Sequence, residues 1–138
     1  MAAPFMGGCM CGAVRYECSA EPLMTANCHC RDCRRSSGSP FASVLLVPQD
    51  AVKITGEVKW FGVKADSGNM LSRGFCPDCG SPLFGKPSGS LSAVLGIRAV
   101  SLDDPSWYRP TMDIYTDSAQ PWDYMNPDLS KVPKMPRM

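Results

Sequence analysis

The sequence predicts a mainly β domain made of short antiparallel strands, with few short helical turns. Three observations favour this class. Short apolar or alternating segments recur along the chain, glycine or proline residues separate them, and convincing helical periodicity is absent from almost the whole sequence. A chain of 138 residues is long enough for one domain to bury a substantial core.

The expected strands follow one another through short connections. In chain order they span residues 13–18, 41–47, 52–54, 58–62, 70–75, 82–84, 91–97 and 112–115. One or two helical turns are expected within residues 31–37, and a brief turn near residues 102–107, where Asp103 and Asp104 precede Pro105. The sequence therefore predicts a compact domain over residues 1–125.

The remaining residues, 126–138, are expected to form an extended, proline-rich C-terminal tail. Four prolines between residues 121 and 136 disfavour both helix and central strand in this region. Trp122 and Tyr124 can pin the approach to the tail by burying aromatic area, whereas residues 131–138 have little to bury.

Seven of the eight cysteines fall into three tight clusters. These are Cys9 with Cys11, Cys28 with Cys30 and Cys33, and Cys76 with Cys79. Such spacing is typical of zinc ligands. A secreted disulfide framework is disfavoured because the sequence starts without an export signal and because Cys-x-Cys is too cramped for an easy disulfide.

The two cysteine pairs predict one closed, structural zinc site. In Cys76-Pro-Asp-Cys79-Gly80 the two-residue gap lets both sulfurs face one ion, as in a zinc knuckle. A redox Cys-x-x-Cys would lie where a strand leads into a helix, whereas residues 82–84 read as strand. Cys9 and Cys11 are two residues apart in an extended segment and supply the other two ligands. Removing this zinc should unfold the domain.

The triplet Cys28, Cys30 and Cys33 predicts a second zinc site with an open coordination position. Three sulfurs can hold one face of an ion and leave the fourth position to water or a substrate, which is the arrangement of catalytic zinc. His29 and Cys18 are alternative fourth ligands. His29 lies between two ligands and is a candidate for a supporting role beside the metal and for substrate binding. Cys18 ends a strand and can simply be a small buried residue.

Arg31, Arg34 and Arg35 surround the triplet. A zinc ion with three thiolates carries a net charge of −1, so nearby guanidinium groups would stabilise it, and Arg31 and Arg34 could also hold a substrate carboxylate. A solvated basic turn is the alternative. The aromatic residues of the chain are expected mainly in the core rather than in reactive positions.

The charge balance disfavours nucleic acid as a partner. The formal net charge is +1, and seven bound thiolates subtract seven charges while two zinc ions add four, which gives −2. No apolar run is long enough to span a bilayer, and we expect a soluble, cytoplasmic protein. Self-association, for instance as a homodimer, is left open.

Three segments, GGCMCGAVRYE (residues 7–17), CHCRDCRRSSG (28–38) and RGFCPDCGSPLF (73–84), resemble the glutathione-dependent formaldehyde-activating enzyme family, which is also called the centromere protein V family. PTMDIYTDSAQPW (110–122) resembles the last segment of that family. The resemblance implies a zinc-containing β-tent fold, a structural zinc on Cys9, Cys11, Cys76 and Cys79, and a catalytic zinc on Cys28, Cys30 and Cys33.

The namesake activity of that family is the formation of S-(hydroxymethyl)glutathione from formaldehyde and glutathione, a carbon–sulfur lyase reaction run in reverse. The resemblance thus implies a zinc enzyme that acts on a thiol and a small aldehyde. The chain departs from the family at Asp113, where relatives commonly have histidine; the change is either a harmless surface exchange or one that alters the substrate. A non-catalytic, zinc-stapled module that binds a protein or a small thiol is the alternative function.

Overall fold

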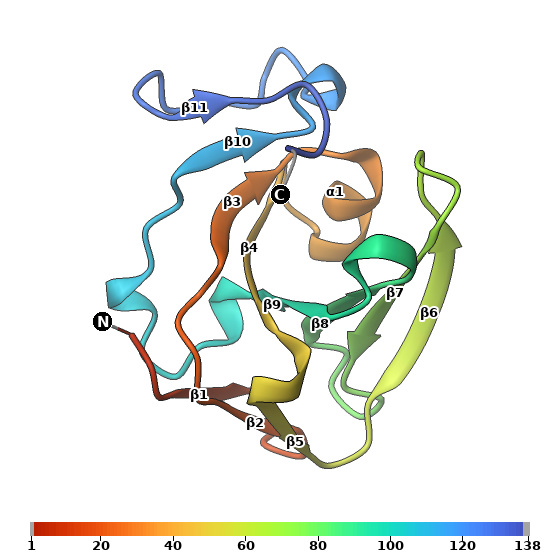
Figure 1. Cartoon of the computed structure of the whole chain (residues 1–138), viewed down its shortest axis with the longest axis vertical. Helices are drawn as coiled ribbons and strands as arrows, with labels where there is room; N and C mark the ends of the chain where they lie inside the picture. Colours follow the sequence, from red (N-terminus) through yellow and green to blue (C-terminus); the bar gives the residue numbers. More distant parts are fainter. Residues whose placement is uncertain (1, 137–138) are drawn as a thin grey trace.

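The computed structural model describes residues 2–136 and is mainly β, as the sequence predicts (Figure 1). The strands are β1 (Phe5–Gly8), β2 (Arg15–Cys18), β3 (Met24–Cys28), β4 (Ala42–Pro48), β5 (Val52–Thr55), β6 (Lys59–Lys64), β7 (Met70–Phe75), β8 (Pro82–Pro87), β9 (Val94–Arg98), β10 (Met112–Ile114) and β11 (Ser130–Lys131). One α-helix, α1 (Arg31–Ser37), lies among residues 2–136. Short 3-10 turns span Gln49–Ala51, Gly89–Leu91, Ala99–Ser101, Pro105–Trp107 and Thr116–Ser118.

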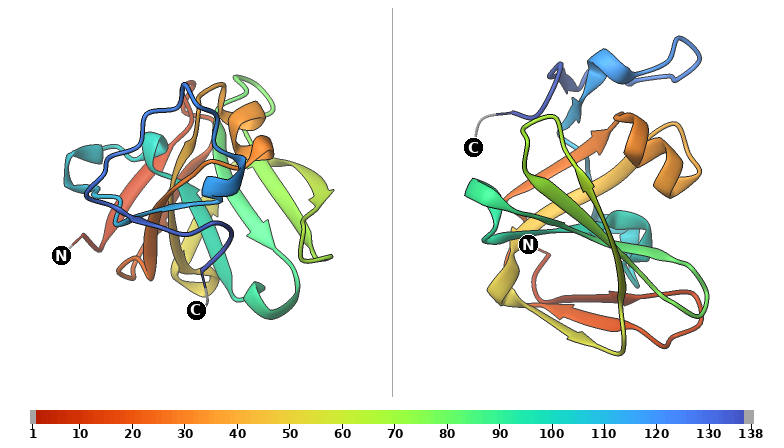
Figure 2. Two further views of the ribbon diagram at one scale, coloured as in Figure 1. Left: turned by 90° about the horizontal axis from the view of Figure 1, so that it is seen from above. Right: turned by 90° about the vertical axis from the view of Figure 1, so that its right-hand side faces the viewer.

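The strands form two sheets. The small sheet has the order β1-β2-β5, and the large sheet has the order β11-β10-β3-β4-β9-β8-β7-β6. Most neighbours pair antiparallel, as expected, but β10 runs parallel to both β3 and β11, which the sequence did not predict. Figure 2 shows the small sheet at one end of the molecule. The residues that follow β10, here called the C-terminal segment, lie over the opposite end, beside β3 and α1.

Most expected strands are present, and three were missed. β1, β3 and β11 lie in segments whose alternation is hidden by glycine, threonine, asparagine or lysine. The expected strand at residues 91–97 starts only at Val94, because a 3-10 turn occupies Gly89–Leu91. The helix over residues 31–37 and the turn before Trp107 are confirmed.

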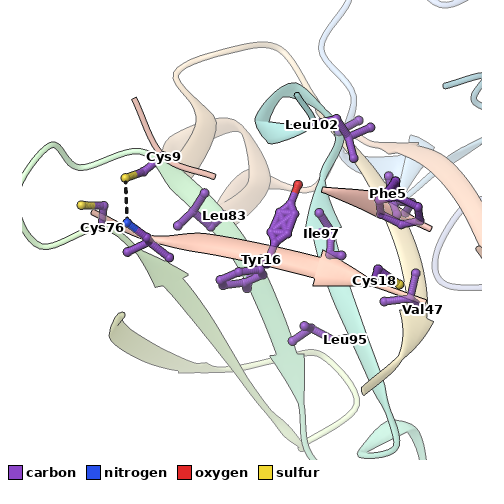
Figure 3. Packing of buried hydrophobic residues seen from close by; sticks show 14 residues of the cluster. Phe5, Cys9, Tyr16, Cys18, Val47, Cys76, Leu83, Leu95, Ile97 and Leu102 are labelled. Atoms are coloured by element: carbon purple, nitrogen blue, oxygen red, sulfur yellow. Dashed lines mark hydrogen bonds between the residues drawn. The ribbon is translucent and has the colours of Figure 1, made fainter. Parts of the chain in front are cut away.

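The core consists of two clusters on opposite faces of β4. Leu45 and Val47 point to the first cluster, which lies between the two sheets, and Leu46 points to the second, under α1 and the C-terminal segment. Burial on both faces explains why β4 is a continuous apolar run instead of an alternating one. In the first cluster Tyr16 packs among Leu83 and Ile97 (Figure 3).

The C-terminal segment differs from the expected tail. β11 pairs with β10, and Val132 and Met135 pack against the second cluster, so residues 131–136 do bury apolar surface. Trp122 and Tyr124, expected to pin this region, are 66% and 82% exposed. The residue between them, Asp123, is buried instead, because its carboxylate contacts the ring of His29. Residues 137–138 of the expected tail lie outside the described residues.

Candidate metal centres and cavity

The first group of sulfurs combines two turns that are far apart in the sequence. Cys9 and Cys11 follow β1, and Cys76 and Cys79 lie in the turn between β7 and β8, where Gly80 adopts a left-handed φ of 76°. All four Sγ atoms lie within 4.8 Å of one another. The sulfur separations are 3.6 Å for Cys9–Cys11 and 3.7 Å for Cys11–Cys76. Two sulfurs bound tetrahedrally at about 2.3 Å from zinc lie about 3.8 Å apart, so this group fits one zinc ion.

Backbone amides support the same sulfurs. The Val14 amide donates to Cys9 Sγ at 3.2 Å, which Figure 3 shows as a dashed line. Ser81 Oγ lies 3.2 Å from Cys79 Sγ, and this hydroxyl together with the Ser81 amide lowers the pKa of Cys79 to about 5. Hydrogen bonds of this kind stabilise the thiolate form, which is the form that binds metal.

The second group brings together Cys28, Cys30 and Cys33 at the junction of β3 and α1. Cys28 is the last residue of β3, where alternate positions face the second core cluster. Cys30 is the N-cap of α1, and its Sγ accepts the Cys33 amide at 3.2 Å. The three Sγ atoms lie within 4.8 Å of one another, so they could hold a metal ion.

In the second group the surroundings favour negative charge on the sulfur of Cys33, while the pKa values of Cys28 and Cys30 are raised. The pKa of Cys33 is lowered by Cys28 and Cys30, whose thiols donate to it, and further by the nearby charges of Arg73 and Arg98. Arg73 Nη2 lies 3.8 Å from Cys33 Sγ. A cation among the three sulfurs would act in the same direction.

His29 lies between two of these cysteines and is fully buried, with a carboxylate on each ring nitrogen. Nε2 lies 2.8 Å from Asp113 Oδ1, and Nδ1 contacts Asp123 Oδ2. Lys131 Nζ donates to the other oxygen of Asp113 at 3.1 Å. A ring protonated on both nitrogens would donate to both carboxylates, and with the Lys131 ammonium it would balance two negative charges.

This cluster of His29, Asp113, Asp123 and Lys131, here called the buried charge cluster, has two consequences. Since both ring nitrogens of His29 are engaged, the ring is not positioned as a fourth metal ligand. The side chain of Asp113 is 1% exposed, so the expectation of a harmless surface exchange at this position is wrong. Asp123 Oδ1 is buried without a described hydrogen-bond partner, which concentrates its bonding on His29.

The other residues singled out from the sequence fall into different places. Cys18 is buried in the first cluster and belongs to neither group of sulfurs. Its thiol is directed to Ala20 O at 3.4 Å. Arg34 Nη1 donates to the carbonyls of His29 and Ser118, so this side chain ties the loop before α1 to the C-terminal segment. Arg31 is exposed and lines the cavity described next, whereas Arg35 is exposed and does not.

A cavity of about 400 Å³ opens over the three-cysteine group. Cys28, Cys30 and Cys33 line it, and none of the four cysteines of the first group does. Its walls are largely apolar and come from β3, β4, β7, β9 and the C-terminal segment; among them are Met24, Leu46, Leu71, Val94 and Met135. Two arginines that the sequence analysis did not single out, Arg73 and Arg98, also line it.

Sequence reasoning missed four of the residues that shape this region: Arg73, Arg98, Asp123 and Lys131. The available signal for the arginines was a single charge within an otherwise apolar strand, as in Val94–Arg98. Asp123 and Lys131 carried no local signal, because their roles come only from contact with His29 and Asp113, many residues earlier. Most of the aromatic side chains expected in the core contribute to packing, and Phe84 is fully buried in the first cluster. Phe61 is the exception, since it is 65% exposed on β6.

Comparisons with known proteins agree on one family. A family model described as glutathione-dependent formaldehyde-activating enzyme matches residues 4–118. A Penicillium rubens protein named "Putative glutathione-dependent formaldehyde-activating enzyme" is 37% identical over 87 residues, which is 59% of this chain and 45% of the relative. A Schizosaccharomyces pombe protein named as an uncharacterized lyase is 29% identical over 80 residues, covering 58% of this chain and 56% of the relative.

The chain thus spans about half the length of these curated relatives. A crystal structure of a Rhodobacter sphaeroides protein superposes with a TM-score of 0.57 and 20% identity, covering 76% of this chain and 91% of the other. This likeness supports the fold alone. Within residues 2–136, no helix has the length and apolar character that crossing a bilayer requires.

Proposed function

Since the chain belongs to the glutathione-dependent formaldehyde-activating enzyme family, we propose that it is a zinc-dependent carbon–sulfur lyase that forms or cleaves the S-hydroxymethyl adduct of a thiol and a small aldehyde. The names of its relatives, a formaldehyde-activating enzyme and a lyase, support this reaction class. In the forming direction a carbon–sulfur bond replaces the π bond of the carbonyl, and the thiol proton ends on the carbonyl oxygen. The reaction needs no oxidant or reductant.

The observation that carries the proposal is the contrast between the two cysteine groups. The four sulfurs of the first group could complete a tetrahedral site, and the cavity does not reach them. Three sulfurs line the cavity in the second group, and His29 and Cys18, the alternative fourth ligands, both point elsewhere. The first group would hold a structural zinc and the second a catalytic zinc with one position open to a small molecule.

A zinc ion bound by Cys28, Cys30 and Cys33 would supply Lewis acidity toward a carbonyl or hold a thiol as its thiolate. The residues of the chain supply the rest. The apolar walls exclude water from the reacting groups, and the buried charge cluster fixes the main chain that carries Cys28 and Cys30. Arg73, beside Cys33 Sγ, stabilises negative charge on the sulfurs and on an incoming anion.

The test is a formaldehyde and thiol exchange measurement by NMR with purified, zinc-loaded protein. We expect exchange faster than in a protein-free control, which is essential because thiols add to formaldehyde unaided. Cys30→Ser should remove the second zinc and the acceleration together, while the first zinc and the fold remain. Exchange rates equal to the protein-free control with every thiol tried would remove the proposed activity.

Cobalt substitution separates this function from a non-catalytic binding module. In a closed site the visible spectrum of cobalt would be insensitive to added thiol, whereas an open site would respond. None of the eight cysteines forms a disulfide, including Cys18, which lies outside both groups. We therefore place the protein in a reducing compartment such as the cytoplasm.

A further inference from the structure

The cavity over the three-cysteine group has an unusual distribution of charge. Its acidic lining residues, Asp32 and Asp66, are both exposed at the rim, where Arg31 and Lys64 lie as well. Among the described residues the interior contributes two guanidinium groups and no carboxylate. The rim charges therefore balance one another, while the interior carries an excess of positive charge.

Arg98 is the more deeply placed of the two interior arginines. Its exposed fraction is 5%, and the hydrogen bond that the described residues give its side chain is from Nη2 to Ser36 Oγ, at 2.8 Å. A guanidinium group has five N–H donors, so most of them are left for a ligand in the cavity that Arg98 lines. Burial lowers the pKa of Arg98 from a high ordinary value, and the group stays charged at neutral pH.

Arg73 extends this positive region to the reacting centre. Arg73 lies on β7, and its side chain is beside the three sulfurs in the cavity wall. Its Nη2 atom is 3.8 Å from Cys33 Sγ. Three thiolates and one zinc ion would carry a charge of −1, and the two guanidinium groups would turn the total to +1. An anionic ligand would offset this positive charge, and a carboxylate suits the planar fork of arginine.

The apolar part of the cavity limits the kind of molecule that can carry this carboxylate. Side chains of Met24, Leu46, Leu71, Val94 and Met135 come from four strands and the C-terminal segment. A ligand with many polar groups would leave them unpartnered against these walls, which is costly. A ligand with an apolar body would instead remove apolar surface from water on both sides.

We propose that this cavity binds an apolar organic carboxylate through Arg98 and Arg73, so that the thiol handled at the three-cysteine group carries a carboxylate a few bonds from its sulfur on an otherwise apolar body. The substrate class, but not the anion subsite, rests on the proposed function. Glutathione, with two carboxylates and an ammonium group, matches this interior less well than a simple mercaptocarboxylic acid does.

The subsite is tested with thiol-free probes on zinc-loaded protein. Methyl-labelled methionine gives NMR signals for Met24 and Met135 inside the cavity, and these are followed during titration with hexanoate, hexanamide and acetate. We expect hexanoate to bind at least tenfold more tightly than hexanamide, which lacks the charge, and at least tenfold more tightly than acetate, which lacks most of the apolar body. Equal binding of hexanoate and hexanamide, or no response to either, would overturn the proposal.

Variants assign the preference to the two arginines. Arg98→Met and Arg73→Met should each reduce hexanoate affinity about tenfold or more while leaving hexanamide affinity nearly unchanged, and Arg98→Lys, which keeps the charge in the core, should lose less. Arg35→Met is the matched control, because Arg35 is exposed on α1 outside the cavity. An unchanged preference for hexanoate in both Arg98→Met and Arg73→Met, with Arg35→Met equally unaffected, would overturn the role of these side chains.

The substrate class has its own readout. A 3-mercaptocarboxylate with an apolar chain should give at least a tenfold higher kcat/KM for formaldehyde exchange than its neutral amide, and the ratio should collapse in Arg73→Met. Equal values in the wild-type protein would refute the class while the exchange itself remained. If no thiol is accelerated at all, the proposed function fails, whereas the methionine signals still decide the anion subsite.

Discussion

Replacing Asp113 by alanine should destabilise the protein far more than its position in a three-residue strand near the surface suggests. The side chain is 1% exposed and bonds His29 and Lys131 at the same time, at 2.8 and 3.1 Å. Its removal leaves a buried histidine with one unpartnered nitrogen and a lysine without its counter-charge. Breaking buried ion pairs by removing one member costs about 3–5 kcal/mol. For a chain of this size that corresponds to a fall in Tm of about 10–20 °C.

The measurement is urea denaturation with excess zinc present throughout, so that any zinc held by the two cysteine groups stays bound in the folded state. Asp103→Ala is the matched control, because it removes a carboxylate whose pair with Arg15 is about half exposed on both sides. An exposed pair of this kind contributes less than about 1 kcal/mol. Asp113→Asn should fall between the two, because the amide keeps the shape and one acceptor but loses the charge.

The reasoning fails if Asp113→Ala and Asp103→Ala lower the free energy of unfolding by similar small amounts. In that case the buried charge cluster would contribute nothing beyond an ordinary surface pair. A large loss in Asp113→Ala with unchanged cobalt binding at the three-cysteine group would uphold the stability argument, but it would contradict the idea that the cluster positions Cys28 and Cys30.

Three further outcomes are expected. Cys76→Ser should unfold the domain when zinc is limiting, whereas Cys30→Ser should stay folded with one zinc per chain by elemental analysis; equal stability of the two would refute the division into structural and open sites. The pKa of Tyr16 is raised to about 12 by burial, so its contribution to stability is present below about pH 10 and lost as the pH rises through about 12. Denaturation at pH 8 and pH 11 should show a smaller alkaline loss in Tyr16→Phe than in the wild-type protein, and parallel losses would contradict this. Lys131→Met should weaken the docking of the C-terminal segment, seen as faster amide exchange at Val132, whose amide donates to Asp113 O; unchanged exchange there would show that Lys131 is dispensable for docking.

Much of the fold could be predicted because the physical causes are local. Strands such as β4 and β7 can be predicted from their apolar or β-branched residues. The end of α1 is indicated by Gly38, whose φ of 66° suits glycine. β3 escaped notice because Thr25 and Asn27 occupy its less buried face, and the small Ala26 conceals the alternation. The parallel placement of β10 beside β3 depends on contacts across the molecule, which no single segment encodes.

The cysteine groups could be predicted for a different reason. Thiol spacing is constrained by the size of a metal ion, so Cys-x-Cys and Cys-x-x-Cys restrict the geometry almost independently of the fold. The partners of His29 could not be predicted in this way, because an aspartate in a proline-rich stretch looks like any solvated charge. Arg98 illustrates the same limit: its sequence position indicates a strand end, and only the packed structure reveals that it faces a cavity.

The buried charge cluster also has a consequence for the order in which the molecule is completed. His29 meets its two carboxylate partners 84 and 94 positions later in the chain. Because the ribosome makes the protein from its amino end, the loop with Cys28, Cys30 and Cys33 is synthesised well before Asp113 and Asp123. The contacts of His29 with these two carboxylates can therefore form only after residue 123 has been made. The three-cysteine group, although it is made early, thus gains these contacts only after residue 123 has been synthesised.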